Sequence, residues 1–235
     1  MRSVAIHQPN FFPWLGYFDK IARADAFVYL DDVQFPKTGG TWSNRVKLLI
    51  GGQPRWVTAA IDRNYHGTRT IREMRFLAEN PWREKLLKSL EVNYCHHQFF
   101  NETLDLVEPL LLNPEVSIAE YNIQGVAAIV ERLGLNKKKL LRSSSLLTEG
   151  DSNELLCSIT GTLGGDVYMC GGGADGYQDE VIFYKHGIKL KHQSFVHPVY
   201  SQRGRADFVP GLSIVDAAMN LGWDGVGQLL HKSKC

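Results

Sequence analysis

Short apolar runs alternate with amphipathic segments at both ends of this chain, and this alternation is the strongest constraint on its fold. Near the N-terminus, residues 4–6 and 26–30 have the pattern of buried strands, and they flank a helix predicted over residues 15–23. The C-terminal part repeats this order, with strands predicted over 139–142, 167–170 and 188–195 and helices over 153–163 and 175–186. Strands that alternate with helices form parallel sheets. The predicted fold class is therefore α/β, a mostly parallel, Rossmann-like sheet with crossover helices.

The middle of the chain interrupts this alternation. Strands predicted over 46–50 and 55–61 flank Gly51-Gly52-Gln53-Pro54, which fits the turn of a small β-hairpin. From residue 81 to 135 the pattern is helical, with Asn80 as N-cap, Pro81 at the first helical position and Gly134 after the last helix. No linker rich in Pro, Gly or Ser separates the regions. We therefore expect a single domain over residues 1–235, with a helical insertion at about 81–135.

Composition limits the classes of function. The 235 residues are 44% hydrophobic, which is enough for a sizeable core. The net charge of +1 predicts no extensive nucleic-acid binding. No apolar run approaches the ~18 residues of a transmembrane segment, and polar residues interrupt the first ten positions, unlike a signal peptide. The four cysteines have neither zinc-ligand nor disulfide spacing, so no metal site is expected. These features predict a cytoplasmic protein that acts on a small molecule.

Polar and aromatic side chains follow the first predicted strand, where the carboxyl ends of parallel strands form a ligand crevice. The candidates for this crevice are His7, Gln8, Asn10, Trp14, Tyr17 and Lys20. His7 is a candidate acid–base group because histidine titrates near neutral pH. A helix that begins near Pro13 would point free N–H groups at the crevice, which favours an anion. Alternatively, His7 is a hydrogen-bonded core residue and the prolines only shape a turn.

A second polar group follows the next predicted strand: Asp31, Asp32, Gln34, Lys37, Asn44 and Arg45. Two carboxylates can hold magnesium or a substrate ammonium, and Lys37 and Arg45 can neutralise a phosphate or carboxylate. Neighbouring strand residues point to opposite faces, so we expect only one of the two aspartates to reach a site. The alternative is an exposed turn with local ion pairs.

A glycine-rich turn follows the predicted strand over 167–170. Gly171, Gly172 and Tyr177 are candidate ligand contacts, because glycines let backbone N–H groups approach a ligand. Cys170 is an alternative nucleophile with His192 or His197 as its base, although a buried cysteine at a strand end is more often structural.

The fourth polar group follows the last predicted strand. Here His197, Tyr200 and Gln202 can orient a polar substrate, and His197 can transfer a proton. Alternatively, Pro198 ends the strand and Tyr200 packs in the interior, while Ser213 has the features of a helix cap. We expect these four groups, at the ends of neighbouring parallel strands, to border one cleft.

Three parts of the sequence carry a family resemblance. The run HQPNFFPWLGYFDKIARADAFVYLDDVQFPK, the pair Asn44-Arg45 and the closing segments HPVYSQ and FVPGLSIVDAAMNLG together resemble the WbqC-like protein family. The similarity spans almost the entire chain. Members of that family occur with genes for bacterial surface polysaccharide, chiefly O-antigen. The resemblance implies a transferase of lipopolysaccharide biosynthesis, with glycine as a suggested aminoacyl group. Relatives generally have serine where this chain has Cys170.

The leading functional hypothesis is an enzyme that transfers an aminoacyl or related acyl group to an amino sugar or sugar-nucleotide, with His7 or His197 moving the proton. One alternative is a nucleotide-sugar glycosyltransferase in which Asp31 and Asp32 hold a metal and a diphosphate. Another is a non-catalytic sugar-binding scaffold. The strand–turn–helix order also resembles nucleotidyltransferase-like enzymes of the pantothenate synthetase type, although Gly16-Tyr17 stands where that type has a second histidine. The cofactor thus remains open, with ATP or another nucleotide as a candidate.

Overall fold

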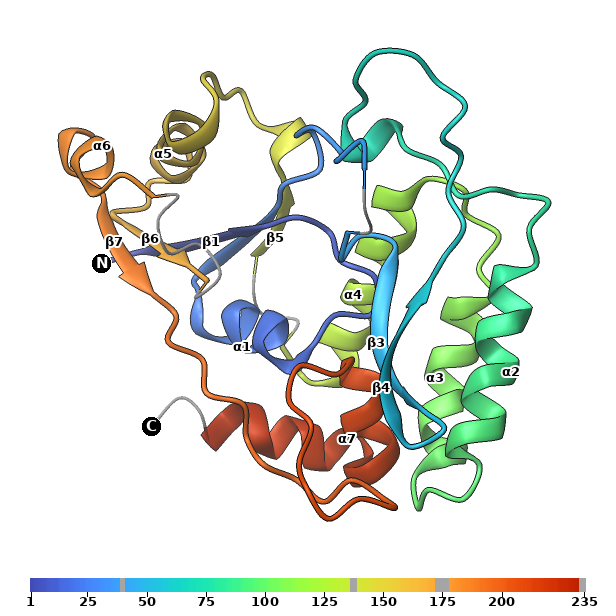
Figure 1. Ribbon diagram of the computed structural model, residues 1–235. Helices are drawn as coiled ribbons and strands as arrows, with labels where there is room; N and C mark the ends of the chain where they lie inside the picture. Colours follow the sequence, from blue (N-terminus) through green and yellow to red (C-terminus); the bar gives the residue numbers. More distant parts are fainter. Residues whose placement is uncertain (39–40, 136–138, 172–177, 233–235) are drawn as a thin grey trace.

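A five-stranded parallel sheet with its helices forms the left part of the molecule in Figure 1. The computed structural model describes residues 1–38, 41–135, 139–171 and 178–232. The strands, in spatial order β5-β2-β1-β6-β7, are β5 Lys139–Arg142, β2 Ala26–Tyr29, β1 Ser3–His7, β6 Val167–Cys170 and β7 Lys189–His192. Every neighbouring pair is parallel, which confirms the predicted α/β fold class.

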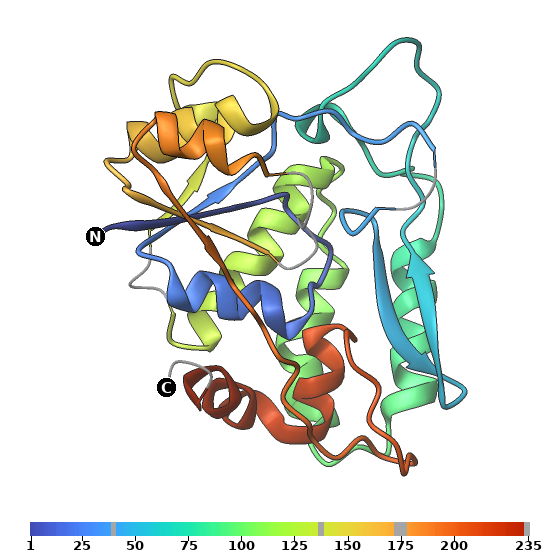
Figure 2. The same cartoon turned by 60° about the vertical axis from the view of Figure 1, so that its left-hand side comes forward.

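Helices cover both faces of this sheet (Figures 1 and 2). One face packs against α5 (Ser152–Thr162) and α6 (Glu180–Lys185). The other packs against α1 (Leu15–Arg23), α4 (Ile118–Arg132) and α7 (Ile214–Lys232). Because side chains alternate along a strand, Val4 and Ile6 of β1 enter the α5–α6 layer and Ala5 enters the α1 layer. His7 continues the direction of Ala5 and packs against Tyr17 of α1, with ring centroids 4.9 Å apart.

The order of the strands places a topological switch point between β1 and β6. The chain leaves β1 through α1, on one face, to reach β2, whereas β6 is entered through α5 on the opposite face. The helix α1, which follows β1, and α6, the next described helix after β6, therefore cover opposite faces, and a crevice lies beyond the carboxyl ends of these two strands. In open α/β sheets this is the position where ligands bind.

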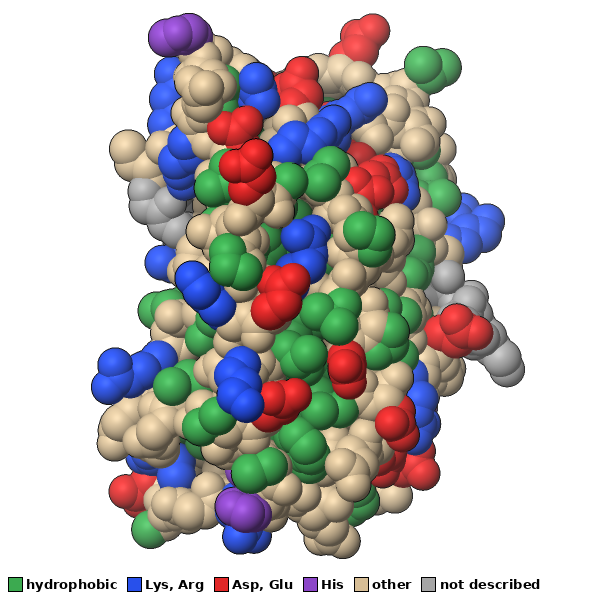
Figure 3. Space-filling view, turned by 90° about the vertical axis from the view of Figure 1, so that its right-hand side faces the viewer, with side chains coloured by type: hydrophobic (Ala, Val, Ile, Leu, Met, Phe, Trp, Pro, Cys, Tyr) green, Lys and Arg blue, Asp and Glu red, His purple; other side chains and the backbone are tan. Residues whose placement is uncertain are grey.

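A hairpin and two further helices lie beside the sheet. The hairpin pairs β3 (Arg45–Ile50) with β4 (Gln53–Thr58), and α2 (Trp82–Tyr94) and α3 (Phe100–Leu111) flank it; short 3-10 turns span Ile71–Glu73 (η1) and Ser143–Ser145 (η2). The turn is shorter than predicted, because Gly51 and Gly52 both adopt positive φ, as a two-residue hairpin turn requires. Figure 3 shows the outer side of this region, where hydrophobic side chains lie among charged side chains of both signs.

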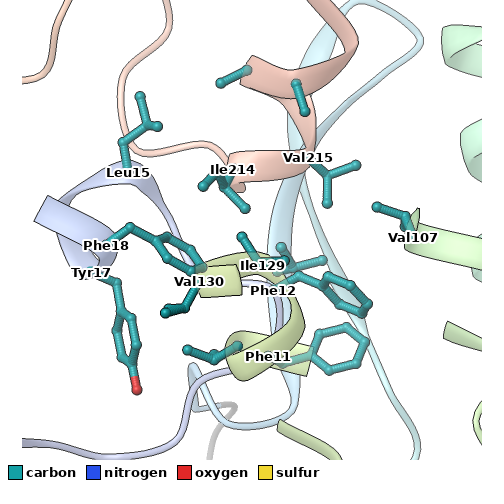
Figure 4. Close-up of a cluster of buried hydrophobic side chains, with 14 of the residues drawn as sticks. Phe11, Phe12, Leu15, Tyr17, Phe18, Val107, Ile129, Val130, Ile214 and Val215 are labelled. Carbon is teal, nitrogen blue, oxygen red and sulfur yellow. The ribbon is translucent and has the colours of Figure 1, made fainter. Parts of the chain in front are cut away.

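The core joins segments that are far apart in the sequence. Phe11 and Phe12 of the N-terminal turn lie in one buried cluster with Ile129 of α4 and with Ile214 and Val215 of α7 (Figure 4). The Ser213 hydroxyl donates to the Phe12 carbonyl at 2.7 Å and accepts from Val215 N, so Ser213 caps α7 as predicted. The division into domains stays a prediction, but this cluster ties the first turn firmly to the last helix.

Two C-terminal elements are shorter than predicted. The helix predicted over 175–186 is α6, Glu180–Lys185, with residues 172–177 outside the described part of the chain. The strand predicted over 188–195 ends at His192, because the Gln193 side chain turns toward α1 and Ser194 adopts a positive φ of 49°. In the described ranges, no helix combines the length and apolar character needed to cross a membrane.

Candidate functional site

A cavity of about 620 Å³ opens at the switch point. This volume is in the range of small-molecule sites. The described residues that line it are Ile6, His7, Gln8 and Trp14 from β1 and its turn, Gly16, Tyr17 and Lys20 from α1, Trp42, Tyr168 and Gly171, and Gln193, Ser194, Phe195 and His197 after β7. The cavity therefore collects the ends of β1, β6 and β7.

His7 presents a neutral imidazole to this cavity. Its Nδ1 lies 3.1 Å from the Gln8 carbonyl oxygen, and since a carbonyl only accepts, Nδ1 carries the proton. Nε2 is then the hydrogen-bond acceptor of the ring, and no described residue donates a hydrogen bond to it. Burial, together with the charge of Lys20, lowers the pKa of His7 to about 3, against a smaller opposing effect of the Gln8 hydrogen bond. His7 is thus uncharged at neutral pH and offers Nε2 as a proton or hydrogen-bond acceptor.

Lys20 places a buried ammonium group at the cavity wall. Its side chain is 3% exposed, and no described carboxylate lies within salt-bridge distance of it. Burial lowers its pKa to about 8, and nearby Cys170 offsets part of this effect. Lys20 therefore stays mostly protonated at neutral pH. Buried charges are normally paired, so this ammonium group favours an anionic ligand.

Aromatic side chains form one wall. The indole rings of Trp14 and Trp42 contact each other with centroids 4.6 Å apart, and Phe195 stands on the far side of Gly16. A Cβ atom on Gly16 would lie 2.6 Å from Trp14 Nε1 and 2.8 Å from Phe195 Cδ1, so only glycine allows this close packing on α1. Flat aromatic surfaces of this kind bind sugar or base rings.

A hydrogen-bonded support holds the segment after β7 against α1. Gln193 Nε2 donates to the Gly16 carbonyl and to Asp19 Oδ2, both at 2.7 Å. Arg23 donates to the Gln193 carbonyl at 2.6 Å and pairs with Asp19 at 3.3 Å. Asp19 is fully buried and its charge is balanced by this network. The network fixes the position from which Phe195 and His197 reach the cavity.

His197 is the second histidine of the cavity. It is half-buried and packs edge-on against Phe195, with centroids 5.0 Å apart. Burial lowers the pKa of His197, and the charge of Lys47 lowers it further. His7 and His197 thus line one cavity although 190 positions separate them in the sequence.

Seven of the candidate residues lie together on the cavity wall: His7, Gln8, Trp14, Tyr17, Lys20, Gly171 and His197. Tyr17 donates its hydroxyl to the Gln8 carbonyl at 3.1 Å, which helps to fix the turn after β1. Asn10 is buried behind this turn, and its Nδ2 has no described partner. Gly172 and Tyr177 lie outside the described residues. The roles of all these residues in binding or catalysis stay predictions.

Asp31 and Asp32 are not among the lining residues. Asp31 accepts from the Ser144 backbone N–H at 3.1 Å and the Ser144 hydroxyl at 2.8 Å, and the Ser143 hydroxyl contacts both carboxylates. These aspartates do not reach the cavity because they follow β2, which is one strand away from the switch point. β2 lies next to β5, and the serines of η2, directly after β5, bind the two carboxylates. No described group of three or more His, Cys, Asp or Glu side chains is arranged to hold a metal ion.

The other candidates near this pair also point elsewhere. Gln34 and Lys37 are exposed, and Gln34 forms a backbone bridge with Thr70. Asn44 is buried and donates to the Ala59 carbonyl at 3.1 Å, which ties the start of β3 to the end of β4. Arg45 lies over the Trp56 ring at 4.2 Å, outside the cavity lining. Their sequence position was informative about the strand ends but not about the direction of each side chain.

Tyr200 and Gln202 enter a buried polar cluster instead of the cavity. Asp216 of α7 accepts from the Tyr200 hydroxyl at 2.8 Å and from the Tyr94 hydroxyl at 2.9 Å. Gln202 Nε2 donates to the Val209 carbonyl at 3.0 Å and approaches Asp216 at 3.5 Å. Burial raises the pKa of Asp216, although these three hydrogen-bond donors oppose the shift. The alternative stated above, that Tyr200 packs in the interior, is the arrangement found.

Sequence reasoning did not select Trp42, Gln193 or Phe195 as site residues. Gln193 and Phe195 lie close to His197 in the sequence, which could have marked them as candidates. However, the strand was predicted to continue to residue 195, so the turn that brings these side chains to α1 was not expected. Trp42 reaches the cavity because Phe11 N donates to its carbonyl at 2.7 Å, a contact with no local sequence signal.

Cys170 is fully buried at the end of β6. Its Sγ lies 3.4 Å from Nδ1 of His192 and 3.6 Å from the Lys191 carbonyl oxygen. The sulfur is therefore held within the α5–α6 layer, on the face of the sheet opposite to His7. This placement favours a structural role for Cys170 over the alternative role as a nucleophile.

Comparison with known proteins agrees with the near full-length resemblance. The profile of the WbqC-like protein family matches residues 8–228. The uncharacterized protein Rv1507c of Mycobacterium tuberculosis (strain ATCC 25618 / H37Rv) is 28% identical over 232 residues, which cover 98% of this chain and 99% of that protein. No solved structure gives a significant match. Since the family profile spans all but the ends of the chain, the chain belongs to the WbqC-like protein family.

Proposed function

We propose that the cavity binds an anionic acyl donor and that the protein transfers an aminoacyl group, such as glycyl, or a related acyl group to an amino sugar or sugar-nucleotide. The reaction would serve the assembly of bacterial surface polysaccharide, chiefly O-antigen. The observation that carries this proposal is the ammonium group of Lys20, which is buried at the cavity wall without a described counter-ion, close enough to His7 for its charge to lower the pKa of His7. Membership in the WbqC-like family is consistent with a small-molecule substrate.

The chemistry follows from these two groups. Lys20 would hold the negative charge of the donor, and Nε2 of His7 would take the proton from the acceptor amine as its nitrogen attacks the acyl carbon. A C–N bond forms, and the donor's leaving group departs with the electron pair. A bound anion would offset the charge of Lys20 and raise the pKa of His7, which makes it a better base in the complex than in the empty cavity. His197 is the second candidate for this proton transfer.

The test combines ligand identification with a matched lysine pair. Native mass spectrometry of the freshly purified protein should show a bound anionic species that Lys20→Met loses and Lys85→Met, a change at an exposed lysine of α2, retains. In a producing bacterium, deletion of the gene should remove an acyl substituent from the polysaccharide, and only the wild type and Lys85→Met should restore it. Unchanged polysaccharide composition in the deletion strain would rule out the proposed reaction.

A further inference from the structure

The aromatic wall of the cavity continues outward onto the β3–β4 hairpin. Trp14 contacts Trp42, and Trp42 contacts Trp56 of β4 with ring centroids 4.7 Å apart. Trp14 and Trp42 line the cavity, whereas Trp56 lies outside it and is 39% exposed. The three indole rings therefore form a continuous path from the buried site to the molecular surface.

Two cations accompany this path. The guanidinium carbon of Arg45 lies 4.2 Å and Nζ of Lys47 5.2 Å from the centre of the Trp56 ring. The register pairs Lys47 with Trp56 directly and places Arg45 two residues away on the same face of the hairpin. Neither cation has a salt bridge to a described carboxylate, and Nε of Arg45 is buried without a described partner.

The backbone of Lys47 joins the hairpin to the segment that carries Trp14, because the Lys47 carbonyl accepts from Ser213 N at 2.9 Å and Ser213 forms a backbone bridge with Trp14. The charge of Lys47 also lowers the pKa of His197 on the cavity wall. The sequence around the hairpin is also rich in positive charge, which favours an anionic ligand. Residues 33–75 hold eight Lys and Arg against two Asp and Glu, although the whole chain has a net charge of only +1. The excess positive charge is thus concentrated in the segment that contains the hairpin.

We infer that Trp56, Arg45 and Lys47 form a rim subsite for a nucleoside diphosphate-linked sugar. The sugar would lie in the cavity against Trp14 and Trp42, the diphosphate beside Lys47 and Arg45, and the nucleoside against the exposed indole of Trp56. This arrangement of the ligand follows the order of the side chains along the path, from the indole rings of the cavity to the two cations and then to the exposed indole ring. The inference rests on the proposed function, and it selects the sugar-nucleotide, rather than a free amino sugar, as acceptor.

Calorimetric titration of the full-length protein with UDP-N-acetylglucosamine, GDP-mannose and pyrophosphate tests the subsite. Wild type should bind at least one sugar-nucleotide more tightly than pyrophosphate, and Trp56→Ala and Lys47→Gln should each weaken that binding by about tenfold. Arg55→Gln is the matched control, because it removes the same charge from the same hairpin but belongs to the other face and should change affinity less than about twofold. Thermal melting of each variant verifies folding.

Three results would overturn the inference: wild type binds neither sugar-nucleotide, Arg55→Gln weakens binding as much as Lys47→Gln does, or pyrophosphate binds as tightly as the sugar-nucleotides and Trp56→Ala changes nothing. The proposed function fails separately. If rim variants weaken sugar-nucleotide binding but no acyl transfer occurs, the subsite stands and the reaction is wrong. If acyl transfer to a sugar-nucleotide occurs and the rim variants bind it as wild type does, the subsite is wrong and the reaction stands.

Discussion

The ammonium group of Lys20 lies against the backbone of Gly171, so that a Cβ atom on Gly171 would be 3.4 Å from Nζ. This contact joins α1 to the end of β6 across the switch point of the sheet. It also excludes bulk water from one side of the ammonium group, which is why burial has the largest effect on the pKa of Lys20.

Lys20→Met should stabilise the protein at neutral pH while it abolishes anion binding. Burial lowers the pKa of Lys20 from 10.5 to about 8. The cost of burying its charge is therefore fully present below pH 8, and we expect the methionine variant to be more stable at pH 7 by roughly 1–3 kcal/mol. Between pH 8 and 10.5 the unfolded chain binds more protons than the folded one, so wild type gains stability as pH rises and the gap should narrow. Urea denaturation at pH 7 and 10 measures both effects, and a less stable variant at pH 7 would contradict the prediction.

His7→Gln should abolish activity and should make the free energy of unfolding less sensitive to acid. The pKa of His7 is about 3 in the folded protein and near 6.5 when exposed. Between these values the unfolded chain binds more protons, so this residue lowers the free energy of unfolding as pH falls from 6.5 toward 3. Wild type should therefore lose stability relative to His7→Gln between pH 7 and pH 4, measured by denaturation of both proteins in parallel. At pH 7 we expect the two stabilities to agree within about 1 kcal/mol, and full activity of the variant would remove His7 from the mechanism.

Gly16→Ala should damage the aromatic wall. The added Cβ would lie 2.6 Å from Trp14 and 2.8 Å from Phe195, so one of these rings must move. We expect a loss of roughly 1–3 kcal/mol in stability and weaker ligand binding. Gly125→Ala in α4 is the control, since no described atom outside the local helix backbone lies within 4 Å of its Cβ position, and it should be neutral or stabilising by up to about 1 kcal/mol. Equal effects of the two changes on ligand affinity would show that the wall does not contact the ligand.

Tyr200→Phe should lower stability without a change in ligand affinity. It removes the hydroxyl that donates to Asp216 at 2.8 Å in the buried polar cluster, outside the cavity lining. The expected cost is about 1–2 kcal/mol of unfolding free energy. Tyr184→Phe, at a residue that is 84% exposed, should have no measurable effect. Loss of ligand affinity in Tyr200→Phe at unchanged stability would return Tyr200 to the substrate-binding set.

Local patterns in the sequence were enough to predict the order of strands and helices along the chain and the place of the first polar group. Apolar periodicity is a local property, and it located β5 and β6 at their observed bounds and α1 at Leu15–Arg23. The rule that parallel strand ends gather polar side chains then brought His7, Lys20 and His197 to one cavity. The predicted strand 188–195 was too long because the hydrogen bonds that end it connect Gln193 to α1, at a distance of more than 170 positions.

Packing between distant segments sets which polar side chains reach the cavity. A buried polar group must find a partner, and the partner that satisfies it is set by packing between distant segments, not by its neighbours in sequence. Asp31 accepts hydrogen bonds from Ser143 and Ser144, and Tyr200 donates one to Asp216. Lys20 has no such partner among the described residues, although its pattern in the sequence is that of an ordinary helix residue. Its ammonium group stays unpaired because no described carboxylate lies within salt-bridge distance of it once the distant segments have packed together.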